Sequence, residues 1–405
     1  LDWVFQESCF STIIRFSWPQ WAVEQGHRYS LARLRGIPPM TMFYPDRPDT
    51  TMFCWAQAMS WGAKYLATDE GVIGNETETL LRQFEAKHQR LLQNPRKISK
   101  LAFYDSKRNR ELYGCYEVST AAWTMSWVQA CVLSNIPWDL LLSGELAQIG
   151  NYDVIVLPDV AVLSDAEIQS FRDFAASDGT LVWGGASGSL DHSGAERSPE
   201  ALTSLLGLEV VSTDTGSETI SAGKGRIVLL ANEAERVAAL RGQNLMRFDA
   251  DAKEQRLKHE SFSDEHRQQF RELAEFTESM IPGGSRLSAE NLPEGVLATL
   301  LATHDDSSLV VHLVNAADTL QIATPEGINH EDRIPYPAHA DQEINIEIRL
   351  PDSFGSRQLN QVSAYDPMQS EPVRLSADLD VEQAKVTVKF NISTLKEYAL
   401  IEVGF

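Results

Sequence analysis

The feature that most constrains the fold of this chain is the segment YDVIVLPDVAVLSDAEIQSFRDFAASDGTLVWGGASG, at positions 152–188. Its VIVLP run is continuously apolar, as in a strand buried on both faces of a parallel sheet. Ser164 then offers an N-cap, and Glu167 completes a capping box for a helix. The helix is expected to end at Asp178-Gly179, and TLVWGG predicts a second buried strand. Such a strand–helix–strand unit requires a parallel sheet with a right-handed crossover, so we predict an α/β domain at the centre of the chain.

Further strands and helices flank this unit. KISKLAFYDS predicts the first strand of the central domain, and STAAWTMSWVQACVLSNI predicts a long helix over it. A second strand is expected from Trp138 to Leu142, and GKGRIVLLAN predicts another farther along. Residues 232–290 are rich in charge and are expected to be helical, with a linker at Pro282-Gly283-Gly284. The pattern predicts a doubly wound α/β domain over residues 95–290.

Residues 1–94 alternate strand and helix patterns. Strands are expected in LDWVFQE, IPPMTMFYP and AKYLAT, and helices at about 22–35, in TTMFCWAQAMSWG and over residues 76–93. Each strand ends in a loop that carries a carboxylate, which is typical of a (β/α)8 barrel with its active site at the C-terminal ends of the strands. Three strands cannot close a barrel, and LDWVFQE opens inside an apolar strand without Met or a polar lead-in. We therefore expect the end of a barrel, with about five strands before it.

The pattern changes to period two from about residue 291. LATLLATHDDSSLVVHLVNA predicts a hairpin about the turn residues 305–308. Strands repeat at short intervals afterwards, in EINIEIRL, VSAYDP, VRLSADLD, AKVTVKFN and YALIEVGF. Residues 291–405 are therefore predicted to form a small antiparallel β-sandwich.

Composition narrows the classes of partner. A chain of 405 residues is too long for one ordinary core, so more than one domain is expected. Its net charge of −22 argues against nucleic acid or an anionic membrane as a partner. The four cysteines form no CxxC pair, which favours a reducing compartment and a cytoplasmic location. The nine histidines contain no HxH or HExxH motif, so we expect neither a metal nor another cofactor.

Glu7 is the sharpest candidate for chemistry. A carboxylate at the C-terminal end of a barrel strand is where a glycosidase places an acid, a base or a nucleophile. Trp18 and Trp21 follow in an aromatic loop and could stack against sugar rings. The alternative is a Glu that caps or salt-bridges the strand end, with tryptophans that cover the barrel rim.

Two further strand ends carry candidate residues. Asp46 and Arg47 follow the second predicted strand and could bind sugar hydroxyls, although a PDRPD turn is by default a solvated loop. Asp69 and Glu70 end the third strand and could support Glu7 across the barrel mouth. They could equally belong to the start of the next helix.

Other motifs in the central domain are weaker. GGASG at residues 184–188 lacks the order of GxGxxG, so a tight structural turn is favoured over a phosphate loop. Ser187 lies in GASGS and not in GxSxG, so a nucleophile elbow is not supported. Cys115 and Cys131 precede and enter a helix, where burial is favoured over catalysis.

The order of these parts resembles a known family. WAQAMSWGAKYLAT is similar to the last helix and strand of the barrel in family 42 β-galactosidases. The segment at 152–191, with LTSLLGLEV and GKGRIVLL after it, resembles their trimerisation domain, an amidotransferase-like α/β fold without amidotransferase chemistry. A β-sandwich follows in both. The resemblance implies a glycoside hydrolase that acts on a carbohydrate and assembles as a homo-oligomer, a trimer or dimer.

Two departures from the family concern the site. Members of the family carry a nucleophilic Glu on the seventh barrel strand, where this chain has PPMTMFYP, and Glu7 would lie on the sixth. The family's acid/base lies on the fourth strand, which these residues do not include. A non-catalytic carbohydrate-binding or oligomerisation protein built on a decayed barrel therefore remains an alternative. A second alternative is an amidotransferase-like hydrolase using Cys115 or Cys131, for which we expect glutaminase and thiol-reactivity assays to be negative.

Overall fold

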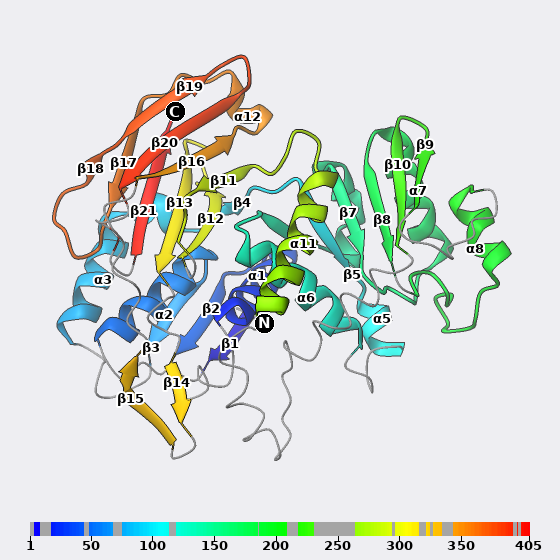
Figure 1. Ribbon diagram of the computed structural model, residues 1–405, viewed down its shortest axis with the longest axis horizontal. Helices are drawn as coiled ribbons and strands as arrows, with labels where there is room; N and C mark the ends of the chain where they lie inside the picture. Colours follow the sequence, from blue (N-terminus) through cyan, green and yellow to red (C-terminus); the bar gives the residue numbers. More distant parts are fainter. Residues whose placement is uncertain are drawn as a thin grey trace.

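The computed structural model describes residues 4–8, 18–43, 48–67, 75–112, 119–184, 186–208, 218–230, 264–293, 296–315, 321–324, 327–333, 343–391, 395 and 398–405. Figure 1 shows three groups of elements. A parallel three-stranded sheet with its helices lies beside a larger, mostly parallel central sheet, and two antiparallel sheets lie above the first group.

The first sheet has the order β1 (Val4–Ser8), β2 (Pro39–Phe43), β3 (Lys64–Ala67), and all its pairs are parallel. Helix α1 (Trp18–Arg35) connects β1 to β2, and α2 (Pro48–Ser60) connects β2 to β3. Helix α1 ends at Arg35, and the next residue, Gly36, has a φ of +64°, a left-handed conformation that glycine adopts without strain. The β/α alternation predicted for this segment is confirmed.

The described helices pack against only one of the two faces of the first sheet. Pro39, Thr41 and Phe43 of β2 are buried, whereas Met40 and Met42 between them are half-buried. Thr41 donates a hydrogen bond to the Gln25 side chain of α1 at 2.7 Å, which assigns the buried row to the helix side. The described helices therefore cover one face of this sheet.

The central sheet has the order β6-β5-β7-β8-β10-β9. Its strands are β5 (Leu101–Asp105), β6 (Trp138–Leu142), β7 (Val154–Leu157), β8 (Thr180–Gly184), β9 (Glu218–Ala222) and β10 (Gly225–Leu230). All neighbours are parallel except β9 and β10. The parallel sheet predicted for this segment is confirmed.

Helices cover both faces of the central sheet. On one face α6 (Ser119–Leu133) and α11 (Asp264–Met280) share a core with Leu101, Phe103 and Val156. On the other face α7 (Asp165–Ser177) buries Ile168, Phe171 and Phe174. The remaining helices of this part are α5 (Lys107–Leu112), α8 (Pro199–Leu206) and the 3-10 helix η2 (Ser143–Asn151).

The strand–helix–strand unit folds as its sequence predicts. Strand β7 is buried at every position, and the side chain of Ser164 accepts a hydrogen bond from the Glu167 backbone. The Glu167 carboxylate accepts one from the Ser164 backbone N–H at 2.7 Å, which completes the capping box. The capping box predicted from local sequence therefore marks the start of this helix.

The turn after β8 is structural. Ser187 Oγ donates to the Leu157 carbonyl at 3.0 Å and accepts from the Val160 N–H at 2.9 Å. Gly188 has a φ of +74°, and a Cβ there would lie 2.8 Å from the Trp183 ring. Ser187 is thus occupied by backbone partners, as the tight-turn interpretation of GGASG predicts; Gly185 lies outside the described residues.

Two antiparallel sheets pack face to face in the C-terminal part. One has the order β18-β17-β21-β13-β12-β4 and the other β11-β16-β20-β19, and their apolar residues share one core. The strands are β4 (Arg96–Lys97), β11 (Leu287–Glu290), β12 (Val296–Ala302), β13 (Ser308–Asn315), β16 (Glu343–Arg349), β17 (Gln361–Tyr365), β18 (Val373–Arg374), β19 (Ser376–Asp380), β20 (Lys385–Asn391) and β21 (Tyr398–Gly404). The turn α12 (Asp352–Gly355) and the separate pair β14 (Gln321–Thr324) and β15 (Gly327–Arg333) complete this part. The predicted hairpin is confirmed as β12 and β13.

Three details differ from the sequence-based expectations. The strand expected over KISKLAFYDS divides, because β4 pairs with β12 of the antiparallel sheet and only β5 joins the central sheet. The helix expected over 76–93 breaks at His88 into α3 (Glu76–Lys87) and α4 (Gln89–Leu92). The first antiparallel strand, β11, begins at Leu287, before the expected boundary.

The break between α3 and α4 places Arg90 against the antiparallel sheet. Its guanidinium contacts the Glu402 carboxylate and donates to Ser308 Oγ at 3.0 Å. Tyr365 also donates to Glu402, at 2.7 Å. Burial disfavours ionisation of Glu402, but these partners outweigh it and hold the pKa of that carboxyl below its ordinary value.

We expect Ser164→Ala to lower the free energy of unfolding by about 1 kcal/mol, because it removes one half of the capping box of α7. Chemical denaturation measures the change. Ser164→Asn should restore most of the loss, and an alanine variant as stable as the parent would contradict the role of the cap.

We expect His312 to destabilise the fold in acid. The ring is buried, Nδ1 contacts the Tyr398 hydroxyl at 2.7 Å, and burial lowers the pKa of His312 to about 3. Because its folded pKa lies below the unfolded value, its contribution is complete above about pH 6.5 and is lost as the pH falls toward 3, by at most about 1.4 kcal/mol per pH unit. The slope of unfolding free energy against pH should flatten in His312→Leu and stay unchanged in the variant His192→Leu, in which the replaced side chain is exposed.

Candidate functional site

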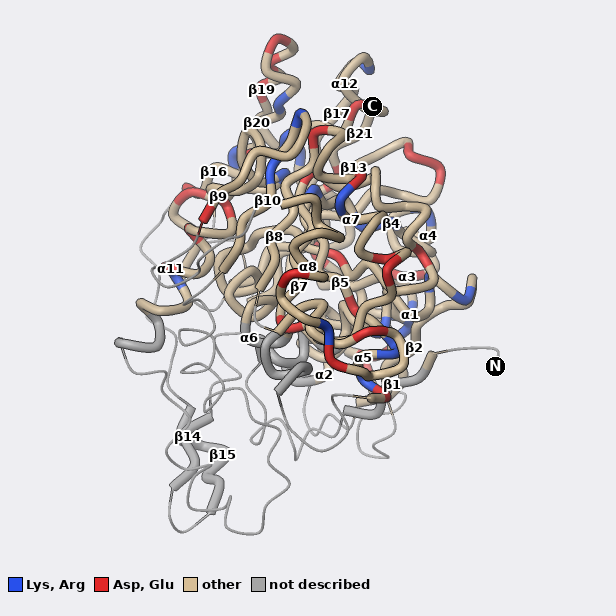
Figure 2. The backbone as a smooth tube through the Cα atoms, turned by 90° about the vertical axis from the view of Figure 1, so that its right-hand side faces the viewer, with Lys and Arg blue, Asp and Glu red and all other residues tan. Residues whose placement is uncertain are grey.

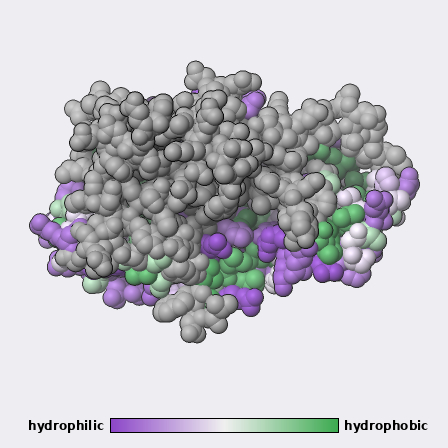
Figure 3. All heavy atoms as spheres, turned by 90° about the horizontal axis from the view of Figure 1, so that it is seen from below, coloured by the Kyte–Doolittle hydropathy of each residue, from purple (hydrophilic) through white to green (hydrophobic). Residues whose placement is uncertain are grey.

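The three strands of the first sheet end at one edge. The strands are parallel, and their register pairs Ser8 of β1 with Phe43 of β2 and Phe43 with Ala67 of β3. These three residues form the last row of the sheet. The predicted residues Asp46, Arg47, Asp69 and Glu70 follow these ends in sequence and lie outside the described residues. Figure 3 looks at the molecule from below, and the described atoms on that side include both polar and apolar groups.

Glu7 occupies the last row but one of β1. The register pairs Glu7 with Met42 and pairs Met42 with Leu66. This row alternates with the buried row of Thr41 and Phe43 that faces the helices. Met42 is half-buried and Leu66 is 37% exposed, so the row lies on the face that the described helices leave uncovered.

Trp18 and Trp21 lie in the first turns of α1 rather than in a loop. The helix begins four residues earlier than about residue 22, the start expected from sequence, because Pro19 is compatible with the first turn of a helix. Both tryptophans therefore belong to the helix that is the next described element after β1. Residues 9–17, between β1 and α1, lie outside the described part.

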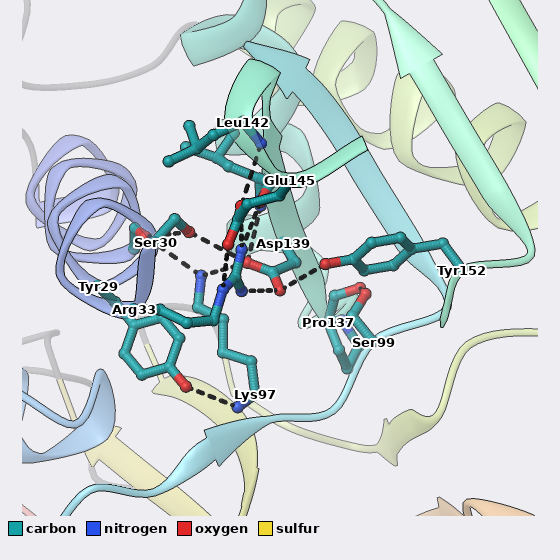
Figure 4. A network of polar contacts seen from close by, with 12 residues as sticks. Tyr29, Ser30, Arg33, Lys97, Ser99, Pro137, Asp139, Leu142, Glu145 and Tyr152 are labelled. Atoms are coloured by element: carbon teal, nitrogen blue, oxygen red, sulfur yellow. Dashed lines mark hydrogen bonds and ion pairs between the residues drawn. The ribbon is translucent and has the colours of Figure 1, made fainter. Parts of the chain in front are cut away.

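A buried ion cluster fixes the other end of α1 to the central sheet (Figure 4). Arg33 donates from Nε and Nη2 to the two carboxylate oxygens of Glu145, at 3.1 and 2.9 Å. Its Nη1 contacts Asp139, and Nη2 also donates to the Leu140 carbonyl at 2.8 Å. One guanidinium thus binds two carboxylates and a carbonyl of the edge strand β6, a use for which its planar fork is suited.

Asp139 is saturated with donors. Besides Arg33, it accepts hydrogen bonds from Ser30 Oγ at 3.1 Å, from the Tyr152 hydroxyl at 3.0 Å and from the Leu140 N–H at 2.8 Å. The side chains of Asp139 and Glu145 are only 6% and 2% exposed. Burial disfavours the charged guanidinium, but Asp139, Glu145 and Tyr152 together outweigh it and keep the pKa of Arg33 above its ordinary value. The polar groups of the cluster therefore bind one another, and its two carboxylates are almost fully buried.

Lys97 approaches the same cluster from β4. Its Nζ lies 4.1 Å from the centre of the Trp138 ring, 5.0 Å from that of Trp61 and 5.2 Å from that of Tyr29. Asp139 is 3.8 Å away, and burial, opposed in part by this carboxylate, lowers the pKa of Lys97 to about 8. Through these contacts, Lys97 of the antiparallel sheet binds residues of both the first group of elements and the central sheet.

His27 makes a second contact between α1 and the central sheet. Its Nε2 lies 3.0 Å from Asp105 Oδ2, at the C-terminal end of β5, and Arg110 contacts the same carboxylate. Burial disfavours ionisation of Asp105, but His27 and Arg110 hold its pKa below the ordinary value. The His27 and Asp105 side chains are 35% and 15% exposed, so this contact is closer to solvent than the Arg33 cluster.

The crevice of the central sheet carries two polar side chains that bind the backbone. Strand β5 has β6 on one side and β7 on the other, which is the point where open α/β sheets bind ligands. Here Asn109 accepts a hydrogen bond from the Val162 N–H at 2.9 Å, and Asp159 accepts one from the Ala186 N–H at 2.9 Å. Both side chains therefore have a structural role in holding the loops around the crevice.

The thiols and the acidic residues suggest no further chemistry within the described part. Cys54 and Cys131 are buried, and burial raises the pKa of the Cys131 thiol, which disfavours the reactive thiolate. Cys9 and Cys115 lie outside the described residues. No group of three metal-binding side chains occurs in the described ranges, and none of their helices is long and apolar enough to cross a membrane. Figure 2 shows Lys and Arg interspersed with Asp and Glu.

Sequence reasoning did not find the ion cluster. Its members are 106 and 112 positions apart in the pairs Arg33–Asp139 and Arg33–Glu145, a separation that local patterns do not report. One signal was present: Asp139 interrupts WDLLL, a strand otherwise built for burial. A carboxylate in such a strand needs a buried partner.

Comparisons with known proteins agree with this architecture. Residues 102–255 match the family model of the β-galactosidase trimerisation domain, which confirms the resemblance predicted for this segment. The structure is similar to a catalytic mutant of a GH42 β-galactosidase from G. stearothermophilus, with a TM-score of 0.58 and 11% identity over 100% of this chain and 60% of that one. No curated protein matches the sequence.

Two other solved structures are similar. An α-L-fucosidase, isoenzyme 2, from Paenibacillus thiaminolyticus gives a TM-score of 0.59 with 12% identity over 94% of this chain and 62% of that one. A β-galactosidase from Rahnella sp. R3 gives 0.54 with 14% identity over 97% and 60%. At such identities the likeness shows the fold, and this chain spans about 60% of the length of these enzymes.

We expect Arg33→Met to lower the free energy of unfolding by about 3–5 kcal/mol, because it removes the one cation that binds both buried carboxylates. Denaturant unfolding measures the loss. As a control, Lys107→Met breaks an exposed pair with Glu111 and should change stability by no more than about 0.5 kcal/mol. Equal effects of the two variants would contradict the role assigned to the cluster.

Proposed function

We propose that this chain is part of a glycoside hydrolase that acts on a β-linked sugar, galactoside-like or a related oligosaccharide, with carboxylate acid/base catalysis. The observation that carries the proposal is the position of Glu7, one row from the carboxyl end of a parallel sheet and in the row of the uncovered face. In a (β/α)8 barrel that row faces the interior, near the end where active sites lie. The match to a β-galactosidase trimerisation domain supports the same class.

Glu7 serves in this proposal as acid/base or nucleophile, and Asp69 or Glu70 supports it from the neighbouring strand end. A second catalytic carboxyl is supplied from elsewhere in the barrel. A separation of about 5–5.5 Å between the two carboxyls gives retention of configuration, and a wider one gives inversion, because a water must then fit between them.

The remaining predicted residues bind substrate. Trp18 and Trp21 supply apolar ring faces for sugar C–H groups, and Asp46 and Arg47 hydrogen-bond hydroxyls. Polar groups arranged around an aromatic platform orient a neutral, polyhydroxylated ligand without a metal or another cofactor.

The three parts have separate tasks in this proposal. Residues 1–94 end the catalytic barrel, 95–290 form an amidotransferase-like domain that mediates homo-oligomerisation as a trimer or dimer, and 291–405 form a β-sandwich. The proposal assigns no chemistry to the central domain, because its described thiols are buried and the described side chains at its crevice bind backbone.

A non-catalytic carbohydrate-binding or oligomerisation protein on a decayed barrel is the second candidate. The observation that favours it is the carboxyl end of β2, where Met42 and Phe43 stand in place of a carboxylate. Such a protein would bind sugars on the same edge without turning them over.

Replacing Glu7 decides between the two. We expect Glu7→Gln in the natural full-length protein to lower glycosidase kcat/KM at least about a hundredfold, the range of a lost acid/base group, with an unchanged melting temperature. Glu111→Gln, at an exposed position of α5, is the control. Activity retained within about tenfold would remove Glu7 from the mechanism, and a parent without activity that still binds oligosaccharide would favour the second candidate.

A further inference from the structure

A small cavity of about 30 Å³ lies where the three parts of the chain meet. Its walls come from Trp61 after α2, from Lys97 of β4, from residues 136–138 before and in β6, and from residues 297–301 of β12. A buried water needs roughly 10–15 Å³ of cavity volume, so the cavity has room for one or two waters or one monatomic ion.

Two of its walls carry unused hydrogen-bond donors. The indole N–H groups of Trp61 and Trp138 are buried and have no acceptor among the described residues. The two residues are only 5% and 3% exposed, and their rings lie 5.4 Å apart. An N–H group buried without an acceptor costs about 1–3 kcal/mol, so both groups favour a guest that accepts hydrogen bonds.

Lys97 adds further donors. Its ammonium donates to the Gly26 carbonyl at 3.3 Å, whereas Asp139 Oδ1, at 3.8 Å, is beyond hydrogen-bond distance. Figure 4 shows the side chain reaching from β4 toward Asp139. Among the described residues, one of its three N–H groups therefore has a hydrogen-bond acceptor, and the ring of Trp138 supplies only a π face.

Two polar side chains of the lining already have partners in the protein. Asn135 Oδ1 accepts the Ala298 N–H at 2.7 Å, and the Thr299 hydroxyl donates to the Ser60 carbonyl at 2.9 Å. Asp139 is shared among Arg33 and three other donors, so its charge compensates Lys97 only in part. The lowered pKa of Lys97 agrees with an ammonium that lacks full compensation.

We propose that this cavity binds a monatomic anion of the halide class, chloride under ordinary conditions, through the Lys97 ammonium and the indole N–H groups of Trp61 and Trp138. A water is less suited, because it accepts at most two hydrogen bonds and carries no charge, whereas an anion accepts from all three donors and compensates the ammonium. A cation is repelled by the ammonium. Bound there, the anion links the three parts of the chain and stabilises their junction.

The test is a halide titration of thermal unfolding in the natural full-length protein. Sodium chloride or bromide replaces sodium gluconate at constant ionic strength, so that general screening stays fixed. We expect a saturable rise in melting temperature with both halides. In Trp61→Phe and Trp138→Phe the halide concentration at half-effect should rise about tenfold, which corresponds to about 1.4 kcal/mol for the lost hydrogen bond.

Trp127→Phe is the matched control, because the Trp127 indole is equally buried but donates to Thr277 at 2.7 Å and does not line the cavity. Its halide response should equal that of the parent. Lys97→Met should abolish the response; if this variant does not fold, the two tryptophan variants decide. The same melting temperature in gluconate and chloride, or a bromide-derivative crystal with no anomalous peak at hydrogen-bond distance from Lys97 Nζ, would overturn the proposal.

Discussion

The structure depends on the burial of two carboxylates beneath one arginine. Asp139 and Glu145 lie at the edge of the central sheet, where their charges could not remain without a cation. Arg33 supplies it from α1, and Gly26 on the same helix permits the close approach, since a Cβ there would lie 2.3 Å from the Trp138 ring. A buried pair adds little net stability over apolar packing, but its loss is costly, so the cluster selects one orientation of α1 on the central sheet.

This constraint gives the central part a role beyond assembly. Helix α1 follows β1, which carries Glu7, and the central sheet holds that helix through Arg33 and, nearer to solvent, through His27 and Asp105. Arg90 makes the equivalent contact with Glu402 of the antiparallel sheet. The helices behind the candidate catalytic edge are thus tied to both other parts.

Local patterns predicted the elements well and their assembly poorly. The capping box of Ser164 and Glu167 and the apolar run of β7 are properties of neighbouring residues, so the sequence shows them directly. The transfer of β4 to the antiparallel sheet and the pairing of Arg33 with Asp139 depend on contacts between distant residues. For the candidate site, the sequence predicted the strand that carries Glu7. The structure adds that Glu7 lies in the same row of the sheet as Met42 and Leu66. The roles of Glu7, Asp69 and Glu70 remain predictions, because chemistry depends on side-chain geometry that a strand pattern does not contain.

The central claim is that the Arg33 cluster makes the first sheet and the central sheet one cooperative unit. Native-state hydrogen exchange in increasing denaturant tests it most directly, because it measures the opening free energy of each segment separately. The account predicts that amides of α1 and β6 open with the same free energy and the same denaturant dependence. Exchange of α1 at a free energy several kcal/mol below that of β6 would contradict it.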